Sequence, residues 1–310
     1  MLRTVAVRAE RWPLSTPFRI SRGVKTAADV VAVTLVQDGR RGRGEGVPYA
    51  RYGENIESVL EQVNSLSNEL TNGMTRADLA GRLGPGAARN AIDCALWDLE
   101  ARLAGRAVAD TLGQPPLHPL VSALTVSLDT PQAMGEAAAR MTGATLIKVK
   151  VDRKNPAACL EAVRAAAPDA ALIEQPLSAD EDSDLLGFES CAPICADESC
   201  HVAADLPGLR DRYQVVNIKL DKTGGLTEAL DLLTEARRMG FGVMVGCMVS
   251  SSMSIAPAFH VARHADFVDL DGPTWIADDY AGGAAQRGAE LLPPEALWGV
   301  PDTATPEGAA

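Results

Sequence analysis

The feature that most constrains the fold is a regular repeat in the second half of the chain. Ionisable residues end successive strand-like segments at Lys150, Glu174, Asp197 and Lys219, which lie 24, 23 and 22 residues apart. Helical patterns separate these segments, most clearly over 226–236. Alternating strands and helices predict a parallel sheet, which we expect to close into an α/β barrel. In such a barrel the active site lies at the C-terminal ends of the strands, where these residues recur.

The strand-like segments are apolar runs bounded by turn signals. Seven of them are predicted in this half of the chain, at 121–127, 145–151, 170–175, 194–197, 214–220, 242–247 and 267–271. Gly224 and Gly225 supply a tight turn after the fifth segment, because glycine adopts backbone angles that other residues avoid.

The first hundred residues have a different order of predicted strands and helices. Strands are predicted at 4–11, 29–37 and 44–48, with Asp38-Gly39 as a hairpin turn, and helical spacing follows. An antiparallel sheet followed by helices predicts an α+β unit. We therefore expect an α+β capping domain over residues 1–118, the barrel over 119–276, and a segment over 277–310 that returns to the cap and ends in a frayed tail.

Composition limits the function. The 310 residues carry a net charge of −12, which argues against a nucleic-acid-binding protein. No apolar run is long enough to cross a membrane, and the first residues lack the apolar core of a signal peptide. The six cysteines form no CxxC pair, so we expect reduced thiols in a cytoplasmic protein and no structural zinc site.

Lys148 and Lys150 are the first candidate site residues. Because side chains alternate along a strand, both should point to one face. Two ammonium groups inside a barrel disfavour each other's charge, which would lower the pKa of one lysine toward that of a useful base. An outward-facing strand edge is the structural alternative.

Two carboxylates end consecutive strands. Glu174 closes an apolar segment of a kind that usually stays apolar, and Asp197 repeats the pattern one unit later. Carboxylate oxygens at neighbouring strand ends suit Mg²⁺. Helix capping by Asp197 or Ser199 is the structural alternative.

A second lysine and a pair of aspartates complete the set. Lys219 could face Lys150 across the barrel mouth, and Asp269 and Asp271 leave the last strand in one direction, where they could hold a substrate ammonium group. A solvated turn is the alternative for either segment. Two lysines that flank a carbon atom, together with carboxylates for a divalent cation, suit proton abstraction next to a carboxylate.

These motifs make the chain resemble the enolase superfamily, in its muconate-lactonizing branch, and most closely the L-Ala-D/L-Glu dipeptide epimerases. The likeness covers nearly the whole chain, with matching segments at 17–23, 44–54, 88–99, 147–150, 173–177, 196–201, 217–225 and 269–273. The Asp-x-Asp segment is specific for the dipeptide branch. The resemblance implies a modified TIM barrel with an N-terminal α+β capping domain.

The resemblance also implies catalytic roles. Lys150 and Lys219 would be the acid/base pair on the two sides of the substrate, as in enolase-superfamily sites that use a lysine base with Mg²⁺. Lys148 would contact the substrate carboxylate and help to depress the pKa of Lys150. Glu174 and Asp197 would bind Mg²⁺.

The substrate-binding residues follow in the same way. Asp269 and Asp271 would hold the α-ammonium group of a dipeptide, and Thr125 on the first barrel strand would touch the substrate. The loop after Ser21 belongs to the capping domain, which closes the site. In this loop Lys25 would offer a point charge, rather than an arginine fork, to the distal carboxylate of a glutamyl residue.

The chain departs from the family's pattern in one place. The family has a further strand between the Lys-x-Lys and Glu-Gln-Pro segments, and that strand ends in the first metal-binding aspartate. Here Lys150 and Glu174 are one repeat apart, not two. Asp152 or Asp169 could substitute, but neither lies where strand alternation favours it. We therefore expect a barrel that is one βα unit short and binds Mg²⁺ weakly.

The sequence thus predicts a dipeptide epimerase that converts a substrate such as L-Ala-D-Glu to L-Ala-L-Glu through a Mg²⁺-stabilised enediolate, as in recycling of cell-wall peptides. Its expected partner is a small dipeptide, not a nucleic acid or a membrane. Because members of the family often assemble as oligomers, a homo-oligomer is also possible. The alternatives are an impaired relative that binds a dipeptide or a protein partner, a sister racemase or cycloisomerase, and a Schiff-base aldolase that uses Lys150 or Lys219.

Overall fold

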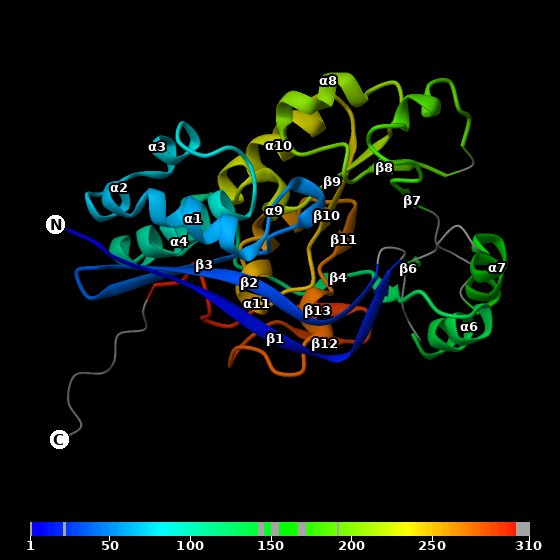
Figure 1. The fold of residues 1–310 in the computed structure, drawn as a ribbon, viewed down its shortest axis with the longest axis horizontal. Helices are drawn as coiled ribbons and strands as arrows, with labels where there is room; N and C mark the ends of the chain where they lie inside the picture. The colour runs from blue at the N-terminus through cyan, green and yellow to red at the C-terminus, as the bar shows by residue number, and fades with distance from the viewer. Residues whose placement is uncertain are drawn as a thin grey trace.

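A three-stranded antiparallel sheet forms the N-terminal part of the protein (Figure 1). The computed structural model describes residues 2–20, 23–141, 146–149, 155–166, 172–190 and 192–301. The sheet consists of β1 (Thr4–Ile20), β2 (Gly23–Gln37) and β3 (Arg40–Gly46), in that order. Asp38 and Gly39, with φ of 51° and 74°, form the predicted two-residue turn between β2 and β3.

The β1–β2 ribbon is longer than the sequence predicted. Its pairing shifts register between Pro13 and Phe18 and then continues toward the parallel sheet. At its tip the Arg19 N–H donates to Ser127 Oγ at 3.0 Å, and the Leu128 N–H donates to Arg19 O. These contacts explain the extra length, because the end of the ribbon is stabilised by the barrel rather than by its own side-chain pattern.

Helices cover one face of this sheet. They are η1 (Ala50–Tyr52), α1 (Ile56–Ser65), α2 (Ser67–Thr71), α3 (Arg76–Ala80), α4 (Ala87–Ala104) and α5 (Val108–Thr111). Capping boxes start α1 at Asn55 and α3 at Thr75. Gly105, with φ of 60°, ends α4. Leu103, in the last turn of α4, is exposed.

Glycines at every second position of β3 let α4 pack directly against its backbone. Gly42, Gly44 and Gly46 face successive turns of the helix, and a Cβ atom added at Gly44 would collide with Ala91 O. Side chains on one face of a strand recur every two residues, so the three glycines form a continuous smooth stripe. The stripe fixes the helix close to the sheet.

The rest of the chain alternates strands and helices. The parallel strands are β5 (Leu124–Val126), β6 (Ile147–Val149), β7 (Ile173–Glu174), β8 (Ile194–Ala196), β9 (Val215–Ile218), β10 (Gly242–Gly246) and β11 (Phe267–Asp269). The helices and 3-10 turns between them are α6 (Pro131–Arg140), α7 (Pro156–Ala166), η2 (Asp182–Leu185), η3 (Ala203–Asp205), α8 (Leu206–Leu209), α9 (Leu220–Thr223), α10 (Leu226–Arg238), α11 (Ser252–Ile255), α12 (Phe259–Ala262) and η4 (Gly272–Trp275). All seven predicted strands are present.

Among the described residues, the barrel is interrupted between β6 and β7. One sheet has the order β11-β10-β9-β8-β7, and β5 and β6 form a separate parallel pair. A bond from the Ala123 N–H to Val268 O, 2.7 Å long, joins the pair to β11 at the other side. Within the described ranges no pairing links β6 to β7, and Figure 1 shows α6 and α7 at the far right of the molecule, outside β6. The break lies where the sequence predicted a missing βα unit.

The predicted strand 121–127 is wrong in one respect, because it is divided in two. β4 (Leu120–Val121) pairs with β13 (Glu290–Leu292), which pairs with β12 (Ala285–Arg287). After Ser122 the chain turns into the barrel as β5. The division arises because the Ser122 N–H donates to Ala289 O, whereas the next N–H, of Ala123, donates to β11.

The C-terminal segment crosses back to the first helices. The Trp298 indole donates to Cys94 O, and the Gly299 N–H donates to Asp98 Oδ1 at 2.8 Å. Residues beyond 301, which include the predicted frayed tail, lie outside the described residues. No helix in the described parts of the chain is long and apolar enough to span a bilayer.

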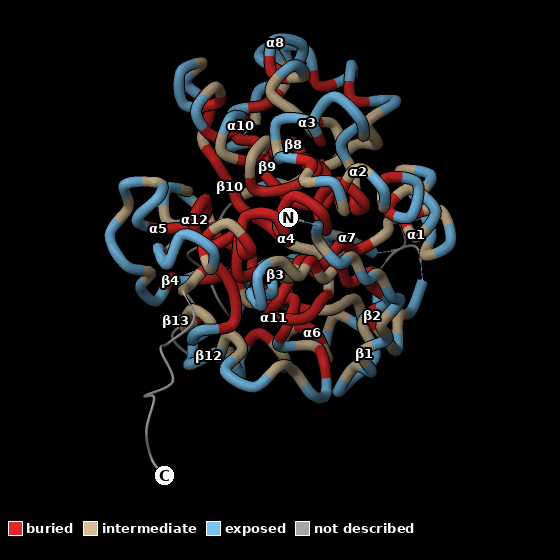
Figure 2. Tube along the Cα trace, turned by 90° about the vertical axis from the view of Figure 1, so that its left-hand side faces the viewer, coloured by how far each residue is buried: buried red, intermediate tan, exposed pale blue. Residues whose placement is uncertain are grey.

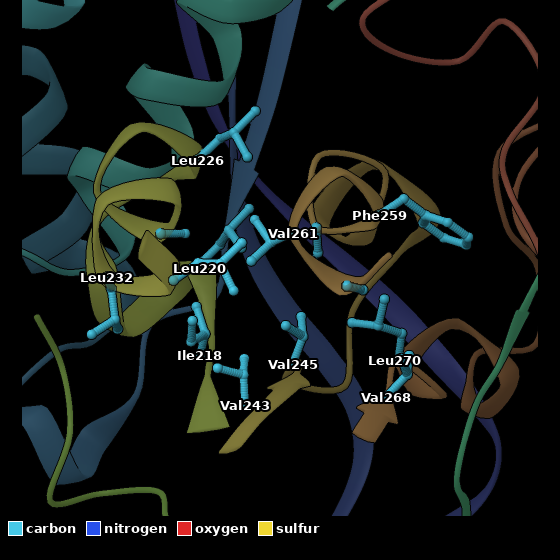
Figure 3. Close-up of a cluster of buried hydrophobic side chains, with 14 of the residues drawn as sticks. Ile218, Leu220, Leu226, Leu232, Val243, Val245, Phe259, Val261, Val268 and Leu270 are labelled. Carbon is cyan, nitrogen blue, oxygen red and sulfur yellow. The ribbon is translucent and has the colours of Figure 1, made fainter. Parts of the chain in front are cut away.

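The largest hydrophobic core lies between the five-stranded sheet and its helices. Strand residues such as Ile218, Val243 and Val245 point toward Leu226 of α10 and Val261 of α12 (Figure 3). Figure 2 shows this interior as a continuous buried zone that reaches α4. The five described cysteines are free thiols. The packed sheet therefore presents its strand ends from a rigid base.

Candidate active site

Five of the predicted site residues meet at the C-terminal ends of the parallel strands. Lys148 lies on β6, Glu174 ends β7, Asp197 follows β8, Lys219 follows β9, and Asp269 ends β11. Lys148 Nζ lies 2.7 Å from Glu174 Oε2 and 2.5 Å from Asp269 Oδ2. Lys219 Nζ lies 2.7 Å from Asp197 Oδ2. The shared strand direction brings them to one edge, as the repeat predicted.

Lys148 bridges two carboxylates. Burial alone would lower the pKa of Lys148, but Asp269 and Glu174 outweigh burial and raise it well above its usual range. Lys148 is therefore not the lysine of the pair whose pKa falls, because carboxylates surround it. Its predicted partner Lys150 lies outside the described residues, as do Asp152 and Asp169.

Asp197 accepts two ammonium groups. Its Oδ2 pairs with Lys219 and its Oδ1 lies 2.9 Å from Lys222 Nζ. Burial would raise the pKa of Asp197, but Lys219 and Lys222 hold it well below its usual range. Burial would likewise lower the pKa of Lys219, and the carboxylate of Asp197 raises it instead. Asp197 and Lys219 are therefore ionised together at neutral pH.

Lys222 is a buried residue that the sequence analysis missed. Its Nζ donates to the carbonyl oxygens of Cys200 and Asn217, both at 2.8 Å, and also to Asp197 O. The ammonium group thus ties the end of β8 to the end of β9. Its only signal in the sequence was its place one helical turn after Lys219, in a segment that resembled a solvated turn.

Asp271 and Thr125 lie beside Asp269. Asp271 Oδ2 accepts hydrogen bonds from the Thr125 N–H at 3.2 Å and the Trp275 indole at 3.4 Å. Burial and the nearby charge of Asp269 raise the pKa of Asp271 to about 6. Among the described residues Asp269 Oδ1 is buried without a hydrogen-bond donor. That oxygen is an acceptor available to a cationic group.

The capping domain contributes a second wall. Tyr52 of η1 packs edge-on against His201, with ring centroids 4.6 Å apart, and the charge of Asp197 adds to burial in raising the pKa of Tyr52. Lys25 lies farther out. Its Nζ is 5.7 Å from the Tyr49 ring, at a cavity of about 560 Å³, and the Tyr49 ring lies 5.2 Å from that of Tyr52.

The oxygen ligands at the strand ends are of the kind that a hard cation prefers, but they are few. Glu174 and Asp197 present carboxylate oxygens from neighbouring strands, and Mg²⁺ is commonly held by one or two carboxylates with waters completing its shell. In the described parts of the chain no group of three or more His, Cys, Asp or Glu is arranged to hold a metal ion. The sequence analysis predicted Glu174 and Asp197 as the metal ligands, and this stays a prediction.

Two family models match the chain. The N-terminal domain of the mandelate racemase/muconate lactonizing enzymes matches residues 2–113. The enolase C-terminal domain-like model matches residues 152–274. Together they cover most of the cap and most of the barrel.

Curated relatives are similar over almost their whole length. The L-Ala-D/L-Glu epimerase of Escherichia coli (strain K12) is 45% identical over 307 residues, which covers 90% of this chain and 96% of the relative. The N-acetyl-D-glutamate racemase of a Pseudoalteromonas species is 41% identical over 300 residues, which covers 87% and 95%.

Solved structures share the fold. An enolase family member from Agrobacterium tumefaciens, described as homologous to dipeptide epimerases and carrying sodium and L-Ala-L-Glu, has a TM-score of 0.93 at 45% identity and covers 96% of this chain and 100% of its own. The dipeptide epimerase from Enterococcus faecalis V583, complexed with Mg and L-Leu-L-Tyr, has a TM-score of 0.86 at 26% identity and covers 96% and 99%.

The length of one alignment bears on the barrel. It runs over 307 positions with the E. coli relative, whereas 90% of this 310-residue chain is about 279 residues. About 28 positions, the difference between 307 and 279, therefore carry no residue of this chain. This shortfall is close to the size of one βα repeat, and it supports a barrel that is one unit short.

Proposed function

The chain belongs to the mandelate racemase/muconate lactonizing enzyme family of the enolase superfamily, and from this premise we propose that it is a dipeptide epimerase that acts on substrates such as L-Ala-D-Glu. One observation carries the proposal. Lysines and carboxylates from five strands converge at one end of the barrel, with Lys148 and Lys219 each paired to a carboxylate.

Lys219 is the proposed acid/base group on one side of the substrate. Its Nζ is buried at the barrel mouth and is held by Asp197, so its position is fixed before a substrate binds. Lys150 is the proposed group on the opposite side, where it would return a proton to the other face of the α-carbon. The pair would thereby invert the configuration of the glutamyl residue.

Asp269 and Asp271 are the proposed anchors for the dipeptide ammonium group. Asp269 already binds one ammonium group, that of Lys148, and keeps Oδ1 available. A substrate ammonium group would release Lys148 from Asp269, which frees Lys148 to bind the substrate carboxylate. Thr125 places its backbone beside Asp271. Lys25 is the proposed contact for the distal carboxylate of the glutamyl residue.

Glu174 and Asp197 would hold Mg²⁺. When bound, the cation supplies positive charge that stabilises an enediolate. The proposal includes weak binding, because two carboxylates, rather than three, are assigned to the cation and each is already paired with a lysine. A calorimetric titration that showed tight, stoichiometric binding of Mg²⁺ would contradict this part of the proposal.

Deuterium exchange tests the proposed reaction. With L-Ala-D-Glu and Mg²⁺ in D₂O, we expect the NMR signal of the glutamyl α-proton to disappear while the L,L product accumulates. Lys219→Ala should lose the reaction by at least about 100-fold, because removal of an acid/base group typically costs that much. Circular dichroism of both proteins shows whether they are folded.

Two other outcomes would point to different functions. Exchange with N-acetyl-D-glutamate but not with the dipeptide would favour the racemase activity for which the Pseudoalteromonas relative is named. No exchange with either compound, from folded protein that still binds the dipeptide, would favour an impaired relative. The interruption between β6 and β7 and the shortfall in length are the observations that favour this second candidate.

A further inference from the structure

We propose that Gln175 is a positioning residue that fixes Glu174 relative to Asp197. The inference rests on the proposed function, because it concerns the two carboxylates proposed to hold Mg²⁺. Gln175 follows Glu174 directly at the end of β7. Its side chain reaches away from its own strand to the loop after β8, where Asp197 lies.

β7 is weakly held by the sheet itself. It pairs only with β8, through Ile173 with Ile194 and Glu174 with Cys195, among the residues that the structure describes. A central strand of a closed barrel would be paired on both edges. Contacts made by the residue next to Glu174 therefore add to the one described edge of strand pairing in fixing the position of Glu174.

The amide of Gln175 supplies such contacts. Its Oε1 accepts hydrogen bonds from the Asp197 N–H at 2.8 Å and the Ser199 N–H at 3.2 Å. Its Nε2 lies 2.8 Å from Leu177 O and 2.9 Å from the hydroxyl oxygens of Ser199 and Tyr213. One side chain thus joins the backbone of the β7 end to the backbone of Asp197.

The partners of this amide are themselves anchored. Ser199 Oγ and Tyr213 OH both donate to Asp182 Oδ2, at 2.6 Å and 2.9 Å, and Arg212 pairs with the other oxygen of Asp182. With their hydrogens committed to Asp182, the two hydroxyls are left as acceptors for Gln175. The network therefore specifies an amide, with one acceptor and one donor end, at position 175.

The backbone of Gln175 supports the same conclusion. Its φ is 39°, in the left-handed region that favours glycine. A strained residue of this kind persists where the surrounding contacts determine its place, and such residues cluster at functional sites. The bonds made by the amide are the contacts that hold this strained turn beside Glu174.

The carboxylate and the backbone of Glu174 are held separately. Asn217 Nδ2 donates to Glu174 Oε1 at 2.8 Å, and Lys148 pairs with Oε2. A bound cation would displace Lys148, so these side-chain contacts change with occupancy. The Gln175 amide does not contact the Glu174 carboxylate, and it would hold the strand end in either state.

Two variants test the proposal. Gln175→Met keeps the length of the side chain and removes its hydrogen bonds, and Gln175→Gly also relieves the positive φ. The matched control is Gln114→Met, which removes an amide that bonds His260 away from the strand-end cluster. Mg²⁺ binding to each protein is measured by calorimetry without substrate, and the Mg²⁺ dependence of exchange is measured with L-Ala-D-Glu.

We expect both Gln175 variants to bind Mg²⁺ at least about 10-fold more weakly, as for other residues that orient metal ligands, while Gln114→Met binds like the wild type. Saturating Mg²⁺ should restore most of the kcat of the Gln175 variants. A substitution that only damaged the fold would lower kcat at every Mg²⁺ concentration. Unchanged Mg²⁺ affinity in the two folded Gln175 variants would overturn the inference about Gln175 and leave the proposed metal site intact. Failure of the wild type to bind Mg²⁺ would overturn the proposed metal site and this inference with it.

Discussion

Lys222 shows how a single buried charge can organise this site. Its side chain is fully buried, and its ammonium group donates hydrogen bonds to three backbone carbonyls and forms an ion pair with one carboxylate. An ammonium group has three hydrogens, so every one is used. Lys219, three residues earlier, makes one ion pair, with Asp197. Lys222 therefore ties the backbone together, whereas Lys219, the proposed acid/base group, is paired only with the same carboxylate among the described residues.

Replacement of Lys222 should cost much more stability than replacement of Lys219. Lys222→Met leaves three buried carbonyls without their donor, and we expect a loss of about 3 kcal/mol in the free energy of unfolding. Lys219→Met leaves Asp197 paired with Lys222, so we expect a loss below about 1 kcal/mol. Urea denaturation of both variants measures the difference. Equal losses would contradict the division of roles.

The sequence predicts the residues at strand ends better than those that support them. Glu174, Asp197 and Lys219 follow apolar runs at regular intervals, which is a signal that one sequence can show. Gln175 and Lys222 act through bonds to backbone atoms of other strands, and no local pattern records those bonds. These bonds could be identified only once the strand ends were placed in space.

At the scale of elements, the contact between β3 and α4 sets the architecture of the cap. The smooth stripe of Gly42, Gly44 and Gly46 brings the two backbones together over successive helical turns. The sequence analysis placed a strand here at 44–48, whereas β3 begins at Arg40 and ends at Gly46. Glycine weakens strand signals, and only the packing of α4 explains why this segment needs three.

Gly44→Ala should destabilise the cap strongly. The added Cβ would meet the backbone oxygen of Ala91, which no side-chain rotation can move, so the helix must shift. We expect a loss of at least about 3 kcal/mol, at the upper end of overpacking effects. Gly84→Ala is the matched control, since nothing lies within 4 Å of a Cβ there. Urea midpoints of the two variants that agree would rule out this packing argument.

At the scale of the whole molecule, buried carboxyls join the cap to the barrel. Asp221, just after Lys219, accepts the Val47 N–H at 2.8 Å and Asn90 Nδ2 at 2.7 Å, both from the cap. Glu45 of β3 accepts hydrogen bonds from the hydroxyl and N–H of Ser251 in the barrel. The division into cap and barrel could be predicted from the change in rhythm along the chain. This seam could not, because its members are far apart in sequence.

Burial gives these carboxyls unusual pKa values. It raises the pKa of Glu45 to about 8 and that of Asp221 to about 7, in both cases against the hydrogen bonds they accept. Each group therefore binds a proton more tightly in the folded protein than in the unfolded chain. For Glu45 the unfolded value is 4.5, so between pH 4.5 and 8 the folded state holds a proton that the unfolded state has released.

The stability of the protein should therefore fall as the pH rises through this window, and Glu45→Gln should remove part of that fall. The proton on Glu45 stabilises the folded state fully below pH 4.5, and this contribution is lost as the pH approaches 8. A glutamine resembles the protonated acid, because its amide can donate to Ser251 Oγ while its oxygen accepts the Ser251 N–H. Between pH 6 and 8 we expect the free energy of unfolding of the variant to gain about 2 kcal/mol relative to the wild type, from the linkage of one group.

Urea denaturation at the two pH values measures this difference, in which all other titrating groups cancel. Parallel pH profiles would mean that Glu45 is ionised in the folded protein across this range, and that the seam between cap and barrel holds a buried charge.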